Sequence, residues 1–151
     1  ISEKDFEGKV YVANFIFTTC PSTCPQLSTA MARAQERFRE NDKVMLLSHT
    51  VNPEHDSVEV LRKYADLYKA DSQKWLFVTG EKQAIYQQAR CGYAVVAKPK
   101  EENPNDFIHS DKLVLIDKNR QIRGYYDGTD RLEVDRLLIE IKLLLREYGD
   151  M

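Results

Sequence analysis

Two cysteines, Cys20 and Cys24, are separated by three residues, and each is followed by a proline. They come directly after the apolar run 10–17, which predicts a strand buried on both faces, and the sequence after Pro25 predicts a helix. Thiols at this spacing can form a disulfide, which needs Cα atoms no more than about 7 Å apart. They can equally share a metal ion, because the amino end of a helix favours the thiolate form that binds metals. The spacing therefore predicts a redox-active or metal-binding pair on a rigid part of the fold.

Two cysteines rarely complete a metal site, and His109 is the residue that we expect to add a third ligand. Thiolates are soft ligands that select copper(I), zinc or iron–sulfur clusters. His109 follows a polar stretch and stands just before the strand expected from Lys112. In a thioredoxin-like fold, the loop that enters this strand passes next to the cysteine pair. His49, in the second expected strand, and His55, in the turn after it, lack this position, so we interpret both as structural or solvated.

Several other residues have plainer interpretations. Cys91 ends an expected helix next to Gly92, and we interpret it as a buried, inert thiol. The same interpretation is weaker for the pair at 20 and 24, because both cysteines lie at a strand–helix junction beside prolines. Residues that we assign to the core rather than to a site are Met31, Met45, Phe15, Phe17 and Trp75.

The rest of the chain predicts alternating strands and helices. Apolar residues at three- and four-residue steps predict helices after Pro25 and over 58–68, 81–90 and 132–148, and either Asp56 or Ser57 can cap the second of these. Short apolar runs predict strands over 44–48, 75–78, 93–97, 112–117 and 122–126, the last two as a hairpin. With neither repeats nor linkers, residues 1–151 predict one domain, an α/β thioredoxin-like three-layer sandwich with a central mixed sheet.

The composition indicates an ordinary globular domain. The 151 residues are 42% hydrophobic and 30% charged, which suffices for a core without disulfide staples. A net charge of −2 with intermixed signs gives no reason to expect nucleic-acid binding, and no apolar run is long enough to span a membrane. The chain begins at Ile1 without an initiator methionine, so we interpret it as a trimmed sequence whose signal or anchor would have been removed.

Three blocks of sequence resemble the Sco/SenC family: 14–25, 48–56, and 107–111 leading into 113–117. The resemblance extends from about Gly8 to the final helix, and the C-x3-C spacing with a distant histidine separates this family from C-x2-C thioredoxins. It implies that copper, as Cu(I) or Cu(II), is bound by Cys20, Cys24 and His109. It also implies a role in assembling the binuclear copper centre of cytochrome c oxidase.

The resemblance further implies a partner and a location. The expected partner is the copper-site subunit of cytochrome c oxidase, and we expect a monomer. Family members are usually tethered outside the cytoplasmic or inner mitochondrial membrane, which implies a periplasmic or other extracytoplasmic domain with an N-terminal membrane anchor. The family commonly has an aspartate where this chain has Asn52, so a role of that carboxylate in tuning the site or contacting a partner does not carry over.

Two functions stay open. A copper-binding assembly factor would use two thiolates and one imidazole. A thiol–disulfide oxidoreductase would use Cys20 as the exposed attacking thiolate and Cys24 as the resolving thiol, with His109 lowering a thiol pKa. Both roles need the same reduced pair, so they are compatible. A peroxide-reducing thiol enzyme is a weaker alternative, because nothing in the sequence resembles a dedicated peroxide pocket.

Overall fold

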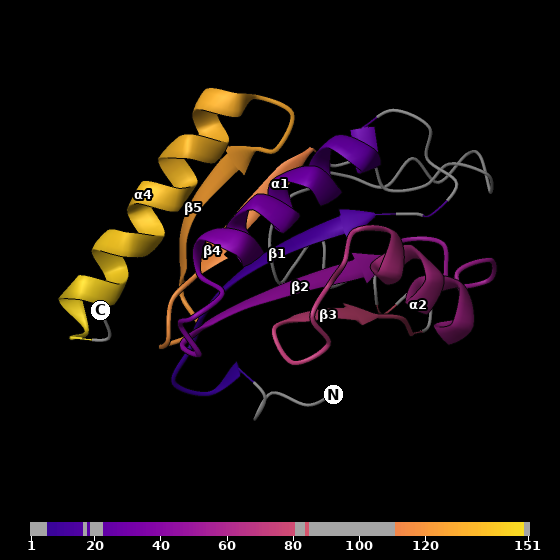
Figure 1. Cartoon of the computed structure of the whole chain (residues 1–151), viewed down its shortest axis with the longest axis horizontal. Helices are drawn as coiled ribbons and strands as arrows, with labels where there is room; N and C mark the ends of the chain where they lie inside the picture. Colours follow the sequence, from indigo (N-terminus) through magenta and orange to yellow (C-terminus); the bar gives the residue numbers. More distant parts are fainter. Residues whose placement is uncertain (1–5, 17, 19–22, 81–83, 85–110, 150–151) are drawn as a thin grey trace.

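Five strands form one mixed sheet in the order β3-β2-β1-β4-β5 (Figure 1). The computed structural model describes residues 6–16, 18, 23–80, 84 and 111–149. Strands β1, β2 and β3 are parallel, whereas β4 is antiparallel to both β1 and β5. The strand bounds are β1 Val10–Ile16, β2 Val44–Thr50, β3 Trp75–Val78, β4 Lys112–Ile116 and β5 Ile122–Asp127.

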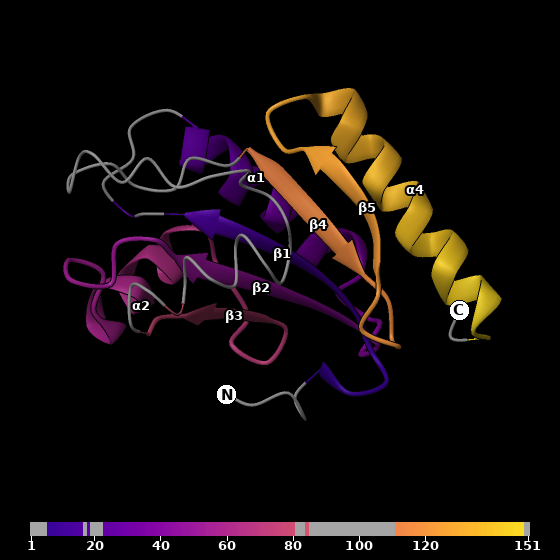
Figure 2. The ribbon, with the colours of Figure 1, turned by 180° about the vertical axis from the view of Figure 1, so that it is seen from behind.

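Three helices accompany this sheet in the described part of the chain: α1 Thr23–Arg37, α2 Val58–Leu67 and α4 Arg131–Glu147. Helix α1 connects β1 to the parallel neighbour β2 and so completes a βαβ unit. Buried residues of α1 and α4 share one apolar cluster with the strands, and from behind the strands lie in front of α1 (Figure 2). These two helices therefore cover the same face of the sheet.

The central strands are buried on both faces. On the helix-covered face, the core includes Leu27 and Met31 of α1, Trp75 of β3, and Leu137 and Ile141 of α4, each at most 1% exposed. A second buried cluster occupies the opposite face and consists of Ala13, Phe15, Leu47, Val51, Val114 and Ile116. Continuous apolar runs, rather than alternating ones, are what strands in the middle of a sandwich require.

The α/β fold class, the mixed sheet, the 112–126 hairpin and the strands expected over 10–17, 44–48 and 75–78 are confirmed. Helix α1 begins at Thr23, so Cys24 and Pro25 both lie in its first turn, where the missing N–H of proline costs nothing. Ser57, not Asp56, caps α2. Met31, Met45, Phe15 and Trp75 are buried as expected. Phe17 and the strand expected over 93–97 lie outside the described residues, as does nearly all of the helix expected over 81–90.

Gly128 packs closely against α1, and this contact predicts that a larger residue at position 128 destabilises the protein. A Cβ on Gly128 would lie 2.3 Å from Cδ2 of Leu27, whose side chain is fully buried. Gly128→Ala should therefore lower the free energy of unfolding by about 1–3 kcal/mol, the usual cost of overpacking, as measured by urea denaturation. Gly80→Ala is the matched control, because no atom of the described residues lies within 4 Å of its added Cβ. Equal stability of the two variants would contradict this packing.

Candidate metal and thiol site

Three strand ends meet at one edge of the sheet, and in the sequence Cys20 and His109 each stand within four residues of one of these ends. The carboxyl ends of β1 and β2 are in register, with Ile16 opposite Thr50. Because β4 is antiparallel to β1, with Val114 opposite Ala13, β4 starts where β1 ends. The chain toward Cys20 and the chain arriving from His109 are therefore attached at the same edge.

Of the predicted ligands, the structure describes Cys24. It is the second residue of α1 and 5% exposed, so its thiol lies at the amino end of a helix, where a thiolate is favoured. Cys20 and His109 lie outside the described residues, and so does Cys91. Within the described residues no group of three His, Cys, Asp or Glu side chains could hold a metal ion. A metal site that uses Cys24 therefore needs ligands beyond this part of the chain.

The described residues on either side of the predicted ligands converge. Asp111, two residues after His109, accepts a hydrogen bond through its carbonyl from the Gly128 N–H at 2.8 Å. Gly128 in turn packs against Leu27 in α1. The segment that enters β4 is thus tied, through one loop, to the helix that begins beside Cys24.

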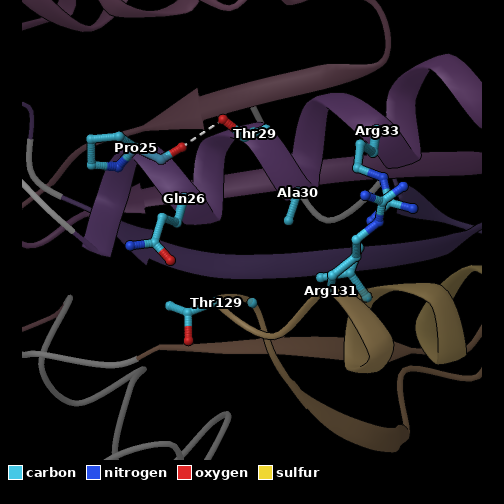
Figure 3. Close-up of a pocket in the computed structure, with 9 residues that line it drawn as sticks. Pro25, Gln26, Thr29, Ala30, Arg33, Thr129 and Arg131 are labelled. Atoms are coloured by element: carbon cyan, nitrogen blue, oxygen red, sulfur yellow. Dashed lines mark hydrogen bonds between the residues drawn. The ribbon is translucent and has the colours of Figure 1, made fainter.

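A groove of about 560 Å³ runs between α1 and the start of α4, beside the first turn of α1. Side chains of α1 face Thr129 and Arg131 across it, and the Thr29 hydroxyl donates to the Pro25 carbonyl at 2.8 Å (Figure 3). An ion pair between Arg33 and Asp135, at 2.5 Å, joins the two helices. Cys24 does not line this groove, so the groove adjoins the candidate site without containing the thiol.

Helix α2 also reaches the turn that carries Cys24. The hydroxyl of Ser28, one turn further along α1, lies 2.8 Å from the Tyr64 hydroxyl. Burial raises the pKa of Tyr64 above its ordinary value and is the largest cause of this shift. Negative charge on Cys24 raises the same pKa further. The Tyr64 phenol is therefore neutral near pH 7 and lies within electrostatic reach of the thiol.

Asp56 is a residue of this edge whose place the sequence did not reveal. Sequence reasoning considered it only as a helix cap, but the Ser57 hydroxyl takes that role by accepting from the Val60 N–H at 3.3 Å. Asp56 is fully buried. Its carboxylate accepts from the Thr18 N–H at 3.0 Å, the Thr18 hydroxyl at 2.5 Å and the Thr50 hydroxyl at 2.7 Å. The sequence signal was a second polar residue directly before the helix cap. This signal does not identify Thr18 and Thr50 as the partners of Asp56.

His49 is structural, as the sequence indicated, and His55 is exposed. The imidazole of His49 stacks on Phe15, with ring centroids 4.9 Å apart and 18° between the planes. Burial lowers the pKa of His49 from 6.5 to about 4. The side chain is thus neutral in the folded protein near pH 7.

His49 should make stability depend on pH. Between pH 6.5 and 4 the unfolded chain binds a proton at this imidazole and the folded chain does not. The free energy of unfolding is therefore unaffected by protonation of His49 above pH 6.5 and falls as the pH drops below it. At pH 5 the loss is about 2 kcal/mol. Urea unfolding at pH 7 and pH 5 should show this loss in the parent but not in His49→Phe, which keeps a ring on Phe15. His55→Gln is the control and should show the same loss of stability as the parent. If the loss persists in His49→Phe, a group other than His49 causes it.

The parallel βαβ unit, the antiparallel hairpin and the cysteine in the first turn of α1 together define a thioredoxin-like protein. The model of one family within this class, SCO1/SenC, matches residues 1–145. The chain belongs to the SCO1/SenC family. A curated relative, the SCO1 protein homolog of Bacillus subtilis, is 29% identical over 145 residues, which are 94% of this chain and 74% of the relative.

Solved structures agree with this assignment. A SCO1/SenC family lipoprotein from Bacillus anthracis has a TM-score of 0.80 at 29% identity, over 93% of this chain and 84% of that one. BsSco, described with a disulfide switch, has a TM-score of 0.80 at 27% identity, over 95% and 84%. Arabidopsis thaliana ScoI, crystallised with copper bound, has a TM-score of 0.75 at 28% identity, over 98% and 91%. No helix among residues 6–80 and 111–149 is long and apolar enough to cross a membrane.

Proposed function

We propose that this protein binds copper through Cys20, Cys24 and His109 and helps to assemble the binuclear copper site of cytochrome c oxidase. The observation that carries the proposal is the likeness to Arabidopsis ScoI with copper bound, which extends over 98% of this chain. The position of Cys24 in the first turn of α1 supports it, because a helix amino end stabilises the thiolate that copper needs.

The donor set suits copper as a cargo. Two thiolates are soft ligands that favour copper(I), and imidazole is a good ligand for copper in either oxidation state. The described residues next to each ligand are compatible with a shared site, since the entry to β4 and the start of α1 are joined through Gly128. The thiols must lose their protons when the metal binds, so copper uptake should be coupled to proton release.

The partner and the location follow from the family. BsSco is described as a member of a family of cytochrome c oxidase assembly proteins, which supports the copper-site subunit of that oxidase as the acceptor for this chain. We infer an extracytoplasmic monomer anchored by an N-terminal segment, in keeping with the lipoprotein of Bacillus anthracis.

Anaerobic copper titrations of single variants test the proposal. Cys20→Ala and Cys24→Ala should each abolish tight copper binding by the reduced protein. His109→Ala should weaken copper(II) binding most and keep part of the copper(I) affinity, because two thiolates alone still favour copper(I). Its free energy of unfolding should change by no more than about 1 kcal/mol.

Two variants serve as matched controls. Cys91→Ala removes a thiol and His55→Ala removes an exposed imidazole, and neither should change copper affinity. If His109→Ala binds copper(II) as tightly as the parent, His109 is not a ligand, and the oxidoreductase function becomes the better account.

Thiol–disulfide exchange is the second candidate function, and the disulfide switch described for BsSco favours it. In such a role Cys20 attacks and Cys24 resolves, with the buried position of Cys24 suiting the resolving thiol. Reduction of a partner's cysteines before copper delivery would combine the two functions on one pair of thiols.

Mild oxidation should therefore join Cys20 to Cys24 and leave Cys91 reduced. The oxidised protein should be lighter by two hydrogen atoms, whose electrons pass to the added oxidant, and it should no longer take up copper, because only thiolates coordinate the metal. Peptide mapping by mass spectrometry locates the bridge. A main product that contains Cys91 would count against this assignment and would make Cys91 a site residue.

A further inference from the structure

The buried carboxylate of Asp56 ties together two chain segments that meet at the candidate site. Thr18 lies beyond the end of β1 and donates both its N–H and its hydroxyl to Asp56. Thr50, the last residue of β2, donates its hydroxyl to the same carboxylate. The turn at Asn52 orients Asp56, because the Asn52 carbonyl accepts from the N–H groups of His55 and Asp56 at 3.2 and 2.8 Å.

A fully buried carboxylate is costly unless its oxygens are hydrogen-bonded. Among the described residues no basic side chain pairs with Asp56, and the three donors come from the two threonines. Thr18 is therefore held by two hydrogen bonds to one buried carboxyl group, from its N–H and from its hydroxyl.

We propose that Asp56 is a positioning residue for the thiol pair: through its bonds to Thr18 it anchors the chain two residues before Cys20. The inference rests on the proposed function only in taking these two cysteines as the working pair. The family commonly has an aspartate where this chain has Asn52. In this proposal the carboxylate beside the thiol pair is that of Asp56, and its role is to position Thr18.

The two threonines differ in what else holds them. Thr50 belongs to β2, where pairing with Ile16 fixes its backbone. Thr18 lies past the last residue of β1, so no strand pairing in the described part of the chain holds it. Loss of the Thr50 hydroxyl also removes the acceptor of the Asn52 N–H at 3.0 Å, but it leaves both Thr18 bonds in place and should lower stability alone. Loss of the Thr18 hydroxyl should also loosen the segment that leads to Cys20.

The test measures the equilibrium between the oxidised pair and glutathione, without copper. Two glutathione molecules reduce the Cys20–Cys24 disulfide to two thiols and leave as one glutathione disulfide. Thr18→Val keeps the N–H bond to Asp56 and removes only the hydroxyl. It should make the disulfide about ten-fold easier to reduce, a rise in midpoint potential of about 30 mV, because a less restrained Cys20 meets Cys24 less often.

Thr50→Val and Thr18→Ser are the matched controls, with thermal unfolding recorded for every variant. Thr50→Val should lower the melting temperature yet keep the parent's reduction equilibrium. Thr18→Ser retains the hydroxyl and should also keep the parent's reduction equilibrium. If Thr18→Val does not fold, Thr18→Ala serves in its place. An unchanged equilibrium in the Thr18 variant, or an equal shift in Thr50→Val, would overturn the proposal.

This reduction equilibrium and the copper titration of the parent together separate this proposal from the copper function. If the shift is found but the parent binds no copper, the positioning role stands and the copper function falls. If the parent binds copper but the shift is absent, the copper function stands and the positioning role falls.

Discussion

The pairing of β1 with a parallel strand on one side and an antiparallel strand on the other determines where chemistry is possible in this protein. It brings the exits of β1 and β2 and the entry of β4 to a single edge of the sheet. Both faces of β1 are buried, so a slip by one residue would exchange the side chains that pack in the two apolar clusters and disrupt both. The edge is therefore a fixed frame on which loops from distant parts of the sequence meet.

Polar contacts at this edge do what apolar packing cannot. A core of leucine and valine specifies which faces meet but does not specify the path of a loop, whereas hydrogen bonds to a buried carboxylate are directional. Asp56 holds Thr18 and Thr50, and the Ser28–Tyr64 contact joins α2 to the turn of α1 that follows Cys24. Hydrogen bonds from the chain after β1, from the end of β2 and between α1 and α2 thus restrain this edge of the sheet.

The sequence was sufficient for the fold class and for the described strands and helices, whereas its site residues stay a prediction. Uninterrupted apolar runs located β1 and β2, and the spacing of Val134, Leu137 and Ile141 located the buried face of α4, because local periodicity reports burial. The role of Asp56 was not accessible, since its partner Thr18 is 38 residues away in sequence and either Asp56 or Ser57 satisfied the capping pattern. Helix and strand propensities depend on neighbouring residues, whereas the hydrogen bonds between Asp56 and Thr18 join residues that are distant in the sequence.

X-ray absorption at the copper edge of the copper(I)-loaded, reduced protein tests the central claim most directly. Two thiolates and an imidazole predict a coordination shell with two sulfurs at about 2.3 Å and one nitrogen at about 2.0 Å, by analogy with zinc. His109→Ala should lose the nitrogen scatterer and keep both sulfurs. A shell without sulfur, or an unchanged nitrogen in His109→Ala, would contradict the account.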